Sequence, residues 1–277
     1  MTVRPVKVGA SVTLGNGPLT IIAGPCLAES HGLCQEVAAT MAAICGRHGL
    51  PFIFKASFDK ANRTSVNSVR GGGMEEGLAI LDRIKAEFGV PVTTDVHLPD
   101  QCAPVAEVVD LLQIPAFLCR QSDLLQAAAA TGKPVNVKKG QFLAPWDARN
   151  IVAKLEAFGA AGIVLTERGT TFGYNALIVD MAGLEAMRGF GHPVCFDATH
   201  SAQRPGAAGE STGGARETIP AMARAAVAVG VDAVFLEVHP DPAKALSDAA
   251  TQWPLAEAEG LIAQLAAIHE LRRSIVP

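Results

Sequence analysis

The sequence predicts a single α/β domain built as a (β/α)8 barrel, and three observations support this fold. Eight short apolar runs rich in β-branched residues alternate with longer amphipathic or alanine-rich stretches, an order typical of parallel strands joined by helices. No second block of different composition follows them. A chain of 277 residues has the usual length of one such barrel. We therefore expect one catalytic domain over residues 1–277, with an open doubly wound sheet as the structural alternative.

Each predicted strand is a short apolar run, as expected for strands buried on both faces. A Gly and a Pro often stand just before the run, as in residues 49–51, 89–91, 132–134 and 191–193, which is typical of a helix that ends shortly before a strand. Amphipathic spacing predicts helices between the runs, for example over 76–88 and 151–158. The eight predicted strands are residues 19–23, 52–56, 92–95, 111–114, 135–138, 162–166, 194–197 and 233–238.

Two segments outside these units carry turn-forming residues. Residues 1–18 precede the first strand, and the Gly-Asn-Gly sequence at 15–17 predicts a short N-terminal β-hairpin over 5–18 that covers the floor of the barrel. Residues 203–217 are rich in Gly, Ala and Ser. We expect this second segment to be a mobile loop that closes over a site at the barrel mouth.

Composition excludes several classes of partner. The net charge of −4 gives no reason to expect nucleic acid or an anionic membrane surface. The N-terminal residues lack the apolar core of a signal peptide, and no uncharged apolar run reaches the length of a membrane-spanning helix. We therefore expect a cytoplasmic protein whose six cysteines are reduced. The absence of a CxxC pair argues against a structural zinc ribbon.

Ionisable side chains recur where the predicted strands end. Functional groups of such barrels lie at the C-terminal ends of the strands, so we expect these side chains to share one mouth. Five of them are cations, on a protein that is acidic as a whole. Some are expected to pair with Asp59, Asp95 and Glu167, but the excess predicts a phosphate-bearing substrate with more than one anionic group. The five cations are Lys55, Lys60, Arg63, Lys138 and Arg168.

A second group combines one thiol, one imidazole and two carboxyl groups. Cys26, His200, Glu237 and Asp248 would suit Zn, Fe(II), Mn or a similar ion, and the thiolate argues against Mg and Ca. Their spacing leaves open the alternative of a core cysteine, a hydrogen-bonded histidine and salt-bridged carboxylates.

Eight motifs, taken together and in order, closely resemble the family of 3-deoxy-D-manno-octulosonate 8-phosphate synthases, which make the Kdo precursor of lipopolysaccharide. The resemblance runs from about residue 20 to residue 256, and its most specific motif is the long run through Arg63. The motifs are 23–26 (AGPC), 54–65 (FKASFDKANRTS), 94–97 (TDVH), 113–117 (QIPAF), 136–140 (NVKKG), 172–175 (FGYN), 196–200 (FDATH) and 235–242 (FLEVHPDP).

The resemblance implies an enzyme that condenses phosphoenolpyruvate with D-arabinose 5-phosphate. Family members hold phosphoenolpyruvate with residues that match Lys60, Lys138 and Arg168, with Lys55 and Gln113 nearby. The corresponding sugar-binding residues are Asn62, Arg63 and Thr64; Ser is common in the family where this chain has Thr64. Arg120 would reach the sugar phosphate of a neighbouring subunit, which implies a homo-oligomer, usually a tetramer.

The resemblance also strengthens the expectation of a metal ion. Metal-independent members of the family carry Asn where this chain has Cys26, and this chain also has Ser247-Asp248-Ala249. Both features resemble the metal-dependent class, in which one divalent ion per subunit (Zn, Fe(II), Mn or Co) would be held by Cys26, His200, Glu237 and Asp248.

In the family reaction, C3 of phosphoenolpyruvate joins the aldehyde carbon of the sugar, water adds at C2 and inorganic phosphate leaves. Fixed cations such as Lys60 and Lys138 would stabilise the developing negative charge, and the ion would orient the water or the aldehyde. Asp95, His97 and His200 are the candidates for proton transfer.

Three rival functions share parts of this pattern. A 3-deoxy-D-arabino-heptulosonate 7-phosphate synthase would take erythrose 4-phosphate, but its motif reads Lys-Pro-Arg where this chain has Lys60-Ala61-Asn62-Arg63. A metal-free Schiff-base aldolase would use Lys55 or Lys138 as nucleophile. A barrel that only binds sugar phosphates would not need the thiol, imidazole and carboxyl groups at one mouth.

Overall fold

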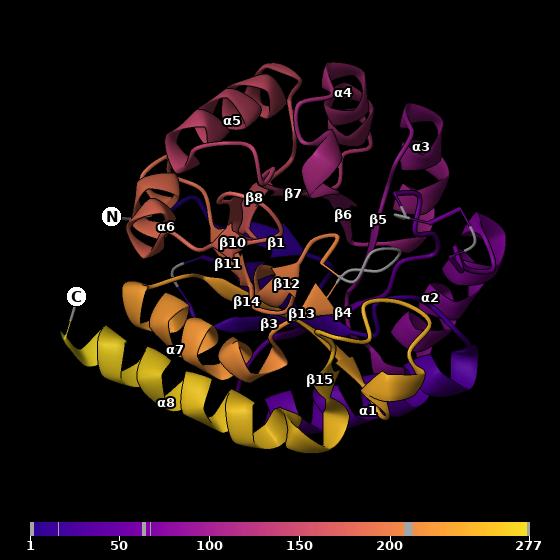
Figure 1. Cartoon of the computed structure of the whole chain (residues 1–277). Coiled ribbons are helices and arrows are strands. Elements are labelled where there is room, and N and C mark those ends of the chain that lie inside the picture. The colour runs from indigo at the N-terminus through magenta and orange to yellow at the C-terminus, as the bar shows by residue number, and fades with distance from the viewer. Residues whose placement is uncertain (1–2, 16, 63–64, 67, 208–212, 276–277) are drawn as a thin grey trace.

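The computed structural model describes residues 3–15, 17–62, 65–66, 68–207 and 213–275. Its centre is a closed barrel of parallel strands in which each barrel strand pairs with the next along the chain, and the pairing of the last, β14, with the first, β3, completes the circle (Figure 1). The predicted (β/α)8 barrel is therefore confirmed. The barrel strands are β3 (Thr20–Gly24), β4 (Phe52–Lys55), β5 (Val92–Asp95), β6 (Leu111–Ile114), β7 (Val135–Lys138), β8 (Ile163–Glu167), β11 (Val194–Asp197) and β14 (Ala233–His239).

Helices surround this barrel and cover its outer face (Figure 1). Their buried stripes and the outward side chains of the strands form one large apolar core, whose burial is the main favourable term in folding. The helices are α1 (His31–Arg47), α2 (Met74–Phe88), α3 (Pro99–Val108), α4 (Ser122–Ala130), α5 (Ala148–Ala157), α6 (Met181–Arg188), α7 (Ile219–Val229) and α8 (Ala258–Ile275). Single 3-10 turns are η1 (Ala116–Leu118), η2 (Pro145–Asp147), η3 (His200–Ala202), η4 (Arg216–Thr218), η5 (Pro242–Lys244) and η6 (Leu255–Glu257).

The N-terminal hairpin is confirmed, but its turn is not where the sequence indicated. Strands β1 (Val6–Val8) and β2 (Val12–Leu14) pair antiparallel, and the turn between them occupies residues 9–11, where Gly9 has a φ of +59°. Gly15 follows the second strand, and Asn16 lies outside the described residues. The apolar side chains of β1 and β2 pack against inward side chains of the barrel such as Ile53, Val164 and Phe235, so the hairpin covers the barrel floor as expected.

Short strands lie in the loops at the C-terminal end of the barrel, opposite the N-terminal hairpin. Strand β12 (Gln203–Arg204) pairs with β13 (Gly213–Gly214), and β9 (Thr170–Thr171) pairs with β10 (Leu177–Ile178). The predicted loop 203–217 therefore carries short strands in its described parts, while residues 208–212 lie outside them. Strand β15 (Trp253–Pro254) pairs in parallel with the end of β14. Among the described residues, none of the helices is both long enough and apolar enough to cross a membrane.

One glycine lets the first two barrel strands approach closely at the mouth. A Cβ atom on Gly24 would overlap the carbonyl oxygen of Lys55, so a larger residue there would push β3 away from β4. This close approach places Cys26, two residues after Gly24, beside the end of β4.

Candidate active site

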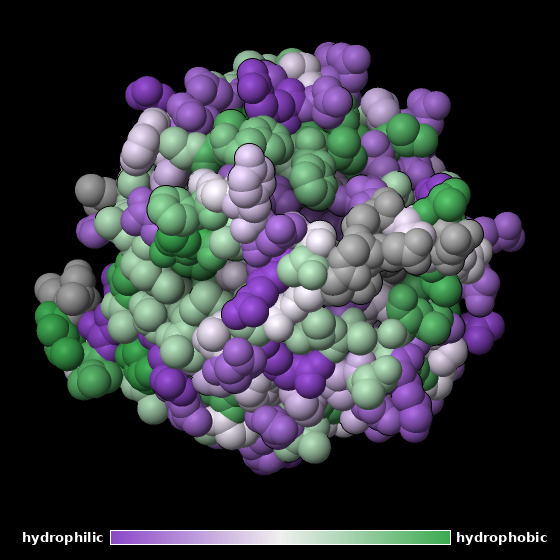
Figure 2. Space-filling view, viewed as in Figure 1, coloured by the Kyte–Doolittle hydropathy of each residue, from purple (hydrophilic) through white to green (hydrophobic). Residues whose placement is uncertain are grey.

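The C-terminal mouth of the barrel contains a cavity of about 520 Å³. Figure 2 shows this face hollowed near its centre, with hydrophilic side chains in the hollow. The polar lining residues come from loops after almost every barrel strand, so segments distant in sequence share one site. They include Lys55, Lys60, Asn62, Asp95, His97, Lys138, Gln141, Arg168, His200, Gln203 and Asp248.

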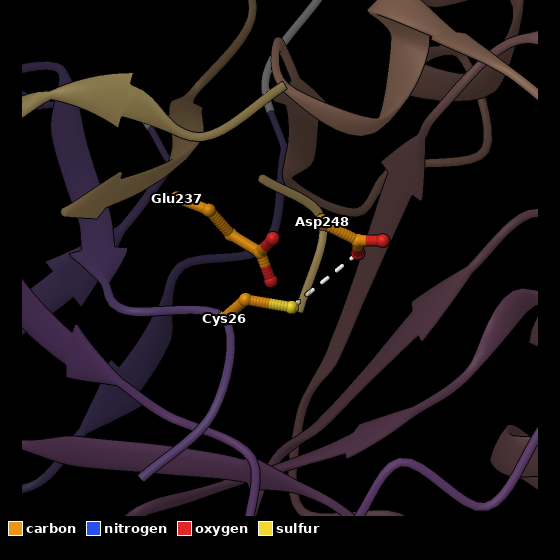
Figure 3. A group of neighbouring side chains, drawn as sticks. All are labelled: Cys26, Glu237 and Asp248. Carbon is orange, nitrogen blue, oxygen red and sulfur yellow. Dashed lines mark hydrogen bonds between the residues drawn. The ribbon is translucent and has the colours of Figure 1, made fainter. Parts of the chain in front are cut away.

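A thiol and two carboxyl groups face one another at the barrel mouth (Figure 3), and the Asp248 carboxyl group among them lines the cavity. One ligand atom each from Cys26, Glu237 and Asp248 lies within 4.8 Å of the others. His200 joins this group, because its Nε2 lies 3.7 Å from Glu237 Oε1 and 3.6 Å from Asp248 Oδ2. The four predicted metal ligands are thus neighbours.

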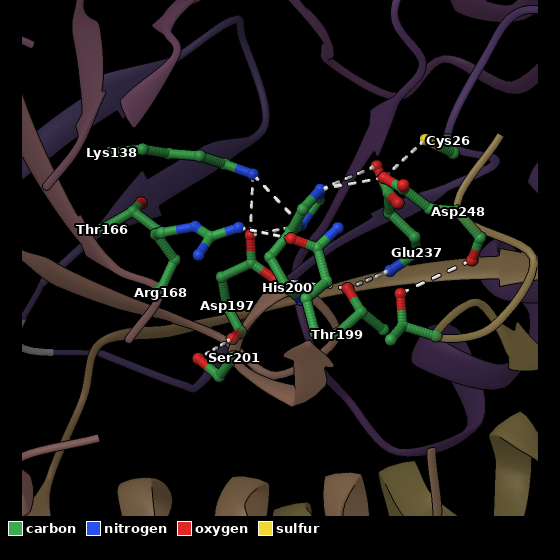
Figure 4. Close-up of polar contacts among 12 residues, drawn as sticks. Cys26, Lys138, Thr166, Arg168, Asp197, Thr199, His200, Ser201, Glu237 and Asp248 are labelled. Atoms are coloured by element: carbon green, nitrogen blue, oxygen red, sulfur yellow. Dashed lines mark hydrogen bonds and ion pairs between the residues drawn. The ribbon is translucent and has the colours of Figure 1, made fainter. Parts of the chain in front are cut away.

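The imidazole of His200 is oriented by a carboxylate behind it (Figure 4). Asp197 Oδ2 lies 2.7 Å from His200 Nδ1, and Asp197 Oδ1 accepts the backbone N–H of His200 at 2.8 Å. A proton on Nδ1 leaves the Nε2 lone pair directed at Glu237 and Asp248. A carboxylate behind a histidine ring is the usual support of a metal-binding imidazole.

The residues present fit a transition-metal ion. Glu237 is buried, and its Oε2 has no hydrogen-bond partner among the described residues, which would be costly for a carboxylate unless another group binds it. Burial and the Asp248 and Glu237 carboxylates raise the pKa of the Cys26 thiol well above its ordinary value. One sulfur, one nitrogen and carboxylate oxygens form a donor set for Zn or Fe(II) rather than for Mg or Ca.

The loop that carries Asp248 is fastened to Cys26 by side chains. Gln252 Oε1 accepts the backbone N–H of Cys26 at 3.2 Å, while Gln252 Nε2 donates to the carbonyl of Ser247 at 2.8 Å. The Ser247 hydroxyl lies 2.9 Å from the sulfur of Cys26. Asp248 itself has a φ of +48°, a conformation that non-glycine residues adopt only where their surroundings hold them.

Cations lie directly beside this group, since Lys138 Nζ is 3.5 Å from His200 Nδ1. The ammonium group of Lys138 donates to Asp197 Oδ2 at 2.7 Å and lies 4.0 Å from the centre of the Phe235 ring. Arg168 is buried; its Nη2 donates to Gln203 Oε1 at 2.6 Å, whereas its Nη1 has no partner among the described residues. A buried guanidinium with an unused donor is suited to an anionic ligand.

A second cationic group surrounds Ser57, at the end of β4. The Ser57 hydroxyl accepts from Lys55 Nζ at 2.8 Å and from Lys60 Nζ at 3.0 Å, and it donates to Asp95 Oδ2 at 2.5 Å. Burial opposes ionisation of Asp95, but Lys55, Lys60 and Lys138 hold the pKa of its carboxyl well below the ordinary value. Asp95 is therefore a fixed anion among cations.

Of the remaining residues predicted for the site, some line the cavity and others lie away from it. His97 lines the cavity, where burial lowers the pKa of its imidazole, and Asn62 is an exposed lining residue. Gln113 is completely buried and contacts Asp95 and Asn136 instead of lining the cavity. Arg120 is exposed and is not among the lining residues. Arg63 and Thr64 lie outside the described residues.

The sequence-based site omitted several residues that hold its members in place. Ser57 and Asn136 lie inside the motifs at 54–65 and 136–140, and Ser247 directly precedes a predicted ligand. Their proximity to charged neighbours in sequence was a usable signal. Gln252, which fastens the Asp248 loop, had no such signal.

Cations, carboxylates and a thiol-containing ligand set at the C-terminal mouth of an α/β barrel define an enzyme that acts on small anionic substrates. The chain belongs to the DAHP synthetase I family, whose model matches residues 4–272.

Three similar proteins carry the name 2-dehydro-3-deoxyphosphooctonate aldolase. The one from a Synechococcus species is 55% identical over 270 residues, which cover 97% of this chain and 95% of the relative. The one from a Cyanothece species is 56% identical over 265 residues, 95% of this chain and 97% of the relative. The one from Nitratidesulfovibrio vulgaris is 57% identical over 251 residues, 91% of this chain and 92% of the relative.

Proposed function

We propose that this chain is a 3-deoxy-D-manno-octulosonate 8-phosphate synthase. It would join C3 of phosphoenolpyruvate to the aldehyde carbon of D-arabinose 5-phosphate while water adds at C2 and inorganic phosphate leaves. The observation that carries this proposal is the identity of 55% with a nearly full-length relative whose name denotes a phosphorylated eight-carbon 3-deoxy keto acid. The product would enter lipopolysaccharide biosynthesis.

The rival reaction gives a seven-carbon product and is suggested by the name of the family model. The named relatives speak against it for this chain, because all three carry the eight-carbon name. Asn62, an exposed residue of the cavity lining, supplies an amide that can bind a hydroxyl of the longer sugar.

Phosphoenolpyruvate would lie among the cations. Arg168 and Lys138 are buried and line the cavity, and Lys60, in the loop after β4, lines the same cavity. Each can bind the phosphate or carboxylate group of this substrate. Their fixed positions stabilise the negative charge that accumulates on the leaving phosphate. Lys55 lies below, with its ammonium group held by Ser57 and Glu237.

The sugar would occupy the outer part of the cavity, near Asn62. We assign its phosphate to Arg63 and the neighbouring hydroxyl to Thr64, two residues outside the described part of the chain. Arg120 would contribute from a neighbouring subunit, which requires a homo-oligomer, in our proposal a tetramer. Exposed aromatic side chains near the mouth support such an assembly; they are Phe117, Phe142, Trp146, Phe172 and Tyr174.

Cys26, His200, Glu237 and Asp248 would hold one divalent ion, Zn, Fe(II), Mn or Co. When bound, the ion supplies Lewis acidity toward a substrate oxygen or water. Asp197 keeps His200 in the tautomer that presents Nε2. Ser247 and Gln252 keep Cys26 and Asp248 in contact.

Among the three candidates for proton transfer, His97 is favoured. Asp95 accepts hydrogen bonds on both oxygens and has a strongly lowered pKa, so it is a poor proton carrier at neutral pH. His200 is committed to the proposed ion. Burial lowers the pKa of His97, which leaves a neutral imidazole that can accept a proton inside the cavity.

We also propose that residues 1–277 form one catalytic domain and that the enzyme works in the cytoplasm. The family match over 4–272 supports the first statement. The second is supported by six cysteines that are all free and buried, as suits a reducing compartment.

The deciding experiment measures phosphate release from phosphoenolpyruvate, with arabinose 5-phosphate and erythrose 4-phosphate assayed side by side. We expect turnover with the five-carbon sugar, its loss after chelation, and its return as Zn, Fe(II), Mn and Co are added in turn to the apo-protein. Preference for erythrose 4-phosphate would favour the rival synthase. A lysine adduct trapped by borohydride, with no effect of chelator, would favour a Schiff-base aldolase.

A further inference from the structure

A layer of polar side chains crosses the inside of the barrel beneath the cavity. The register pairs Asp95 of β5 with Gln113 of β6, and Gln113 with Asn136 of β7. Thr166 of β8 pairs with Lys138 in the register and reaches Asn136 through its side chain. Gln113, Asn136 and Thr166 are all completely buried. Inner layers of such barrels are usually filled with branched apolar residues, so a polar layer needs another explanation than packing.

These side chains form a continuous chain of hydrogen bonds, called here the polar relay (Thr166, Asn136, Gln113 and Asp95). Thr166 Oγ1 lies 2.7 Å from Asn136 Oδ1, Asn136 Nδ2 lies 3.0 Å from Gln113 Oε1, and Gln113 Nε2 lies 2.6 Å from Asp95 Oδ1. At its far end, Asp95 binds Ser57, which binds both Lys55 and Lys60.

The charge of Asp95 fixes the direction of every bond in the polar relay. An ionised carboxylate only accepts hydrogen bonds, so Gln113 must present its NH2 group to Asp95. The oxygen of Gln113 then faces Asn136, which must donate its own NH2 group. The oxygen of Asn136 in turn faces Thr166, whose hydroxyl must donate. The Thr166 hydroxyl thus satisfies the Asn136 oxygen in the one amide orientation that Asp95 requires.

We propose that Thr166 and Asn136 are positioning residues of the reaction: through Gln113 they fix the Asp95 carboxylate, and through Asp95 and Ser57 they set the position of the Lys60 ammonium group in the cavity. This inference rests on the proposed function, in which Lys60 binds phosphoenolpyruvate. Lys138 and Arg168 are held by other partners, Asp197 and Gln203, so the polar relay governs one part of the substrate site and not the whole of it.

Three substitutions test the polar relay. Thr166→Val keeps the shape but removes the donor, and Thr166→Ser keeps the donor. Asn136→Asp places an oxygen against Gln113 Oε1, which forces the Gln113 amide to turn and present an oxygen to Asp95. We expect kcat to fall about tenfold in Thr166→Val and about 100-fold in Asn136→Asp, within the range for small misplacements of catalytic groups. Thr166→Ser should stay within about twofold of the wild type.

The kinetic constants separate positioning from stability. The KM for phosphoenolpyruvate should change less than about threefold, because Lys138 and Arg168 remain in place. The melting temperature of each metal-loaded variant is measured beside its kinetic constants. If the variants melt at lower temperatures but keep the wild-type kcat, the layer only supports the fold. Activity as poor in Thr166→Ser as in Thr166→Val would equally overturn the proposal.

A readout independent of turnover separates failure of this inference from failure of the proposed function. Crystal structures of the wild type, Thr166→Val and Asn136→Asp at one pH would show whether Asp95 and the Lys60 ammonium group move. We expect both to shift in Asn136→Asp, even if the wild type turned out to use another substrate pair. Unchanged positions of both groups in that variant would refute the positioning role, whatever the assay gives.

Discussion

The sulfur of Cys26 lies 3.3 Å from Oδ2 of Asp248, although 222 positions separate the two residues in the chain. Cys26 follows the first barrel strand, and Asp248 belongs to the loop after the last one. These strands are neighbours only because the barrel closes, with β14 paired to β3. Barrel closure therefore assembles the proposed ion site, and Gln252 fastens its two halves.

Replacement of the sulfur tests the ion site directly. In Cys26→Ser a neutral hydroxyl replaces the thiolate ligand, and we expect the affinity for Zn to fall at least about 100-fold, since loss of an outer-shell partner alone costs 10–100-fold. Competition with a chromophoric chelator measures this affinity. Cys102→Ser, at a buried cysteine of α3, is the matched control and should bind as tightly as the wild type. Equal affinities in both variants would exclude Cys26 as a ligand.

The same cysteine predicts how ion binding depends on pH. Burial and two carboxylates raise the pKa of the Cys26 thiol, so the apo-protein carries the proton at neutral pH, whereas the bound ion requires the thiolate. Binding should therefore release a proton from Cys26, and affinity should fall at least about tenfold for each pH unit of acidification, more steeply where His200, whose pKa the Asp197 carboxylate raises against the effect of burial, is also protonated. Calorimetry in two buffers of different ionisation enthalpy counts the released protons. Heats that do not depend on the buffer would contradict this prediction.

The fold was largely predictable from the sequence for a physical reason. Strands buried on both faces are mostly apolar, and Gly and Pro mark where helices end before them, so the ranges predicted as 92–95, 111–114, 135–138 and 194–197 agree with β5, β6, β7 and β11. The N-terminal turn was misplaced because Gly9 and Gly15 both permit positive φ. Local turn preference alone does not decide between them.

The sequence predicted which residues form the site better than it predicted how they are arranged. Strand ends converge in a barrel, so Cys26, His200, Glu237 and Asp248 were expected to meet, and their contacts agree. The strand-end rule does not say which side chains reach the cavity. Gln113 points into the polar layer and is covered by Asp95, because strand tilt and register, which single-strand patterns do not reveal, determine its neighbours.

The hydroxyl of Ser247 should tune the proposed ion site. It lies 2.9 Å from the Cys26 sulfur, and a hydrogen bond to a thiolate stabilises its charge. We expect Ser247→Ala to bind Zn about tenfold more weakly and to shift the sulfur-to-cobalt charge-transfer band of the Co-loaded protein. Ser122→Ala, at a surface serine that accepts from Lys154, serves as control. An unshifted band would mean that the hydroxyl does not act on the sulfur.

A histidine far from the active site should make the fold less stable in acid. His192 is buried, its Nδ1 has no partner among the described residues, and burial lowers the pKa of its imidazole. Between its folded pKa and the ordinary value near 6.5, the unfolded chain binds a proton that the folded chain does not. The free energy of unfolding must therefore fall as the pH drops below that ordinary value.

Glutamine at position 192 cannot take up this proton, so His192→Gln should lose less stability than the wild type between pH 7.5 and about pH 5.5. Urea unfolding of both proteins at the two pH values measures the difference, and acid effects at the proposed ion site are common to both and cancel. His31→Gln, at a histidine on α1 that pairs with Glu87 across the surface, is the control. The prediction fails if His192→Gln loses as much stability in acid as the wild type, because the proton that drives the loss must then bind elsewhere in the unfolded chain.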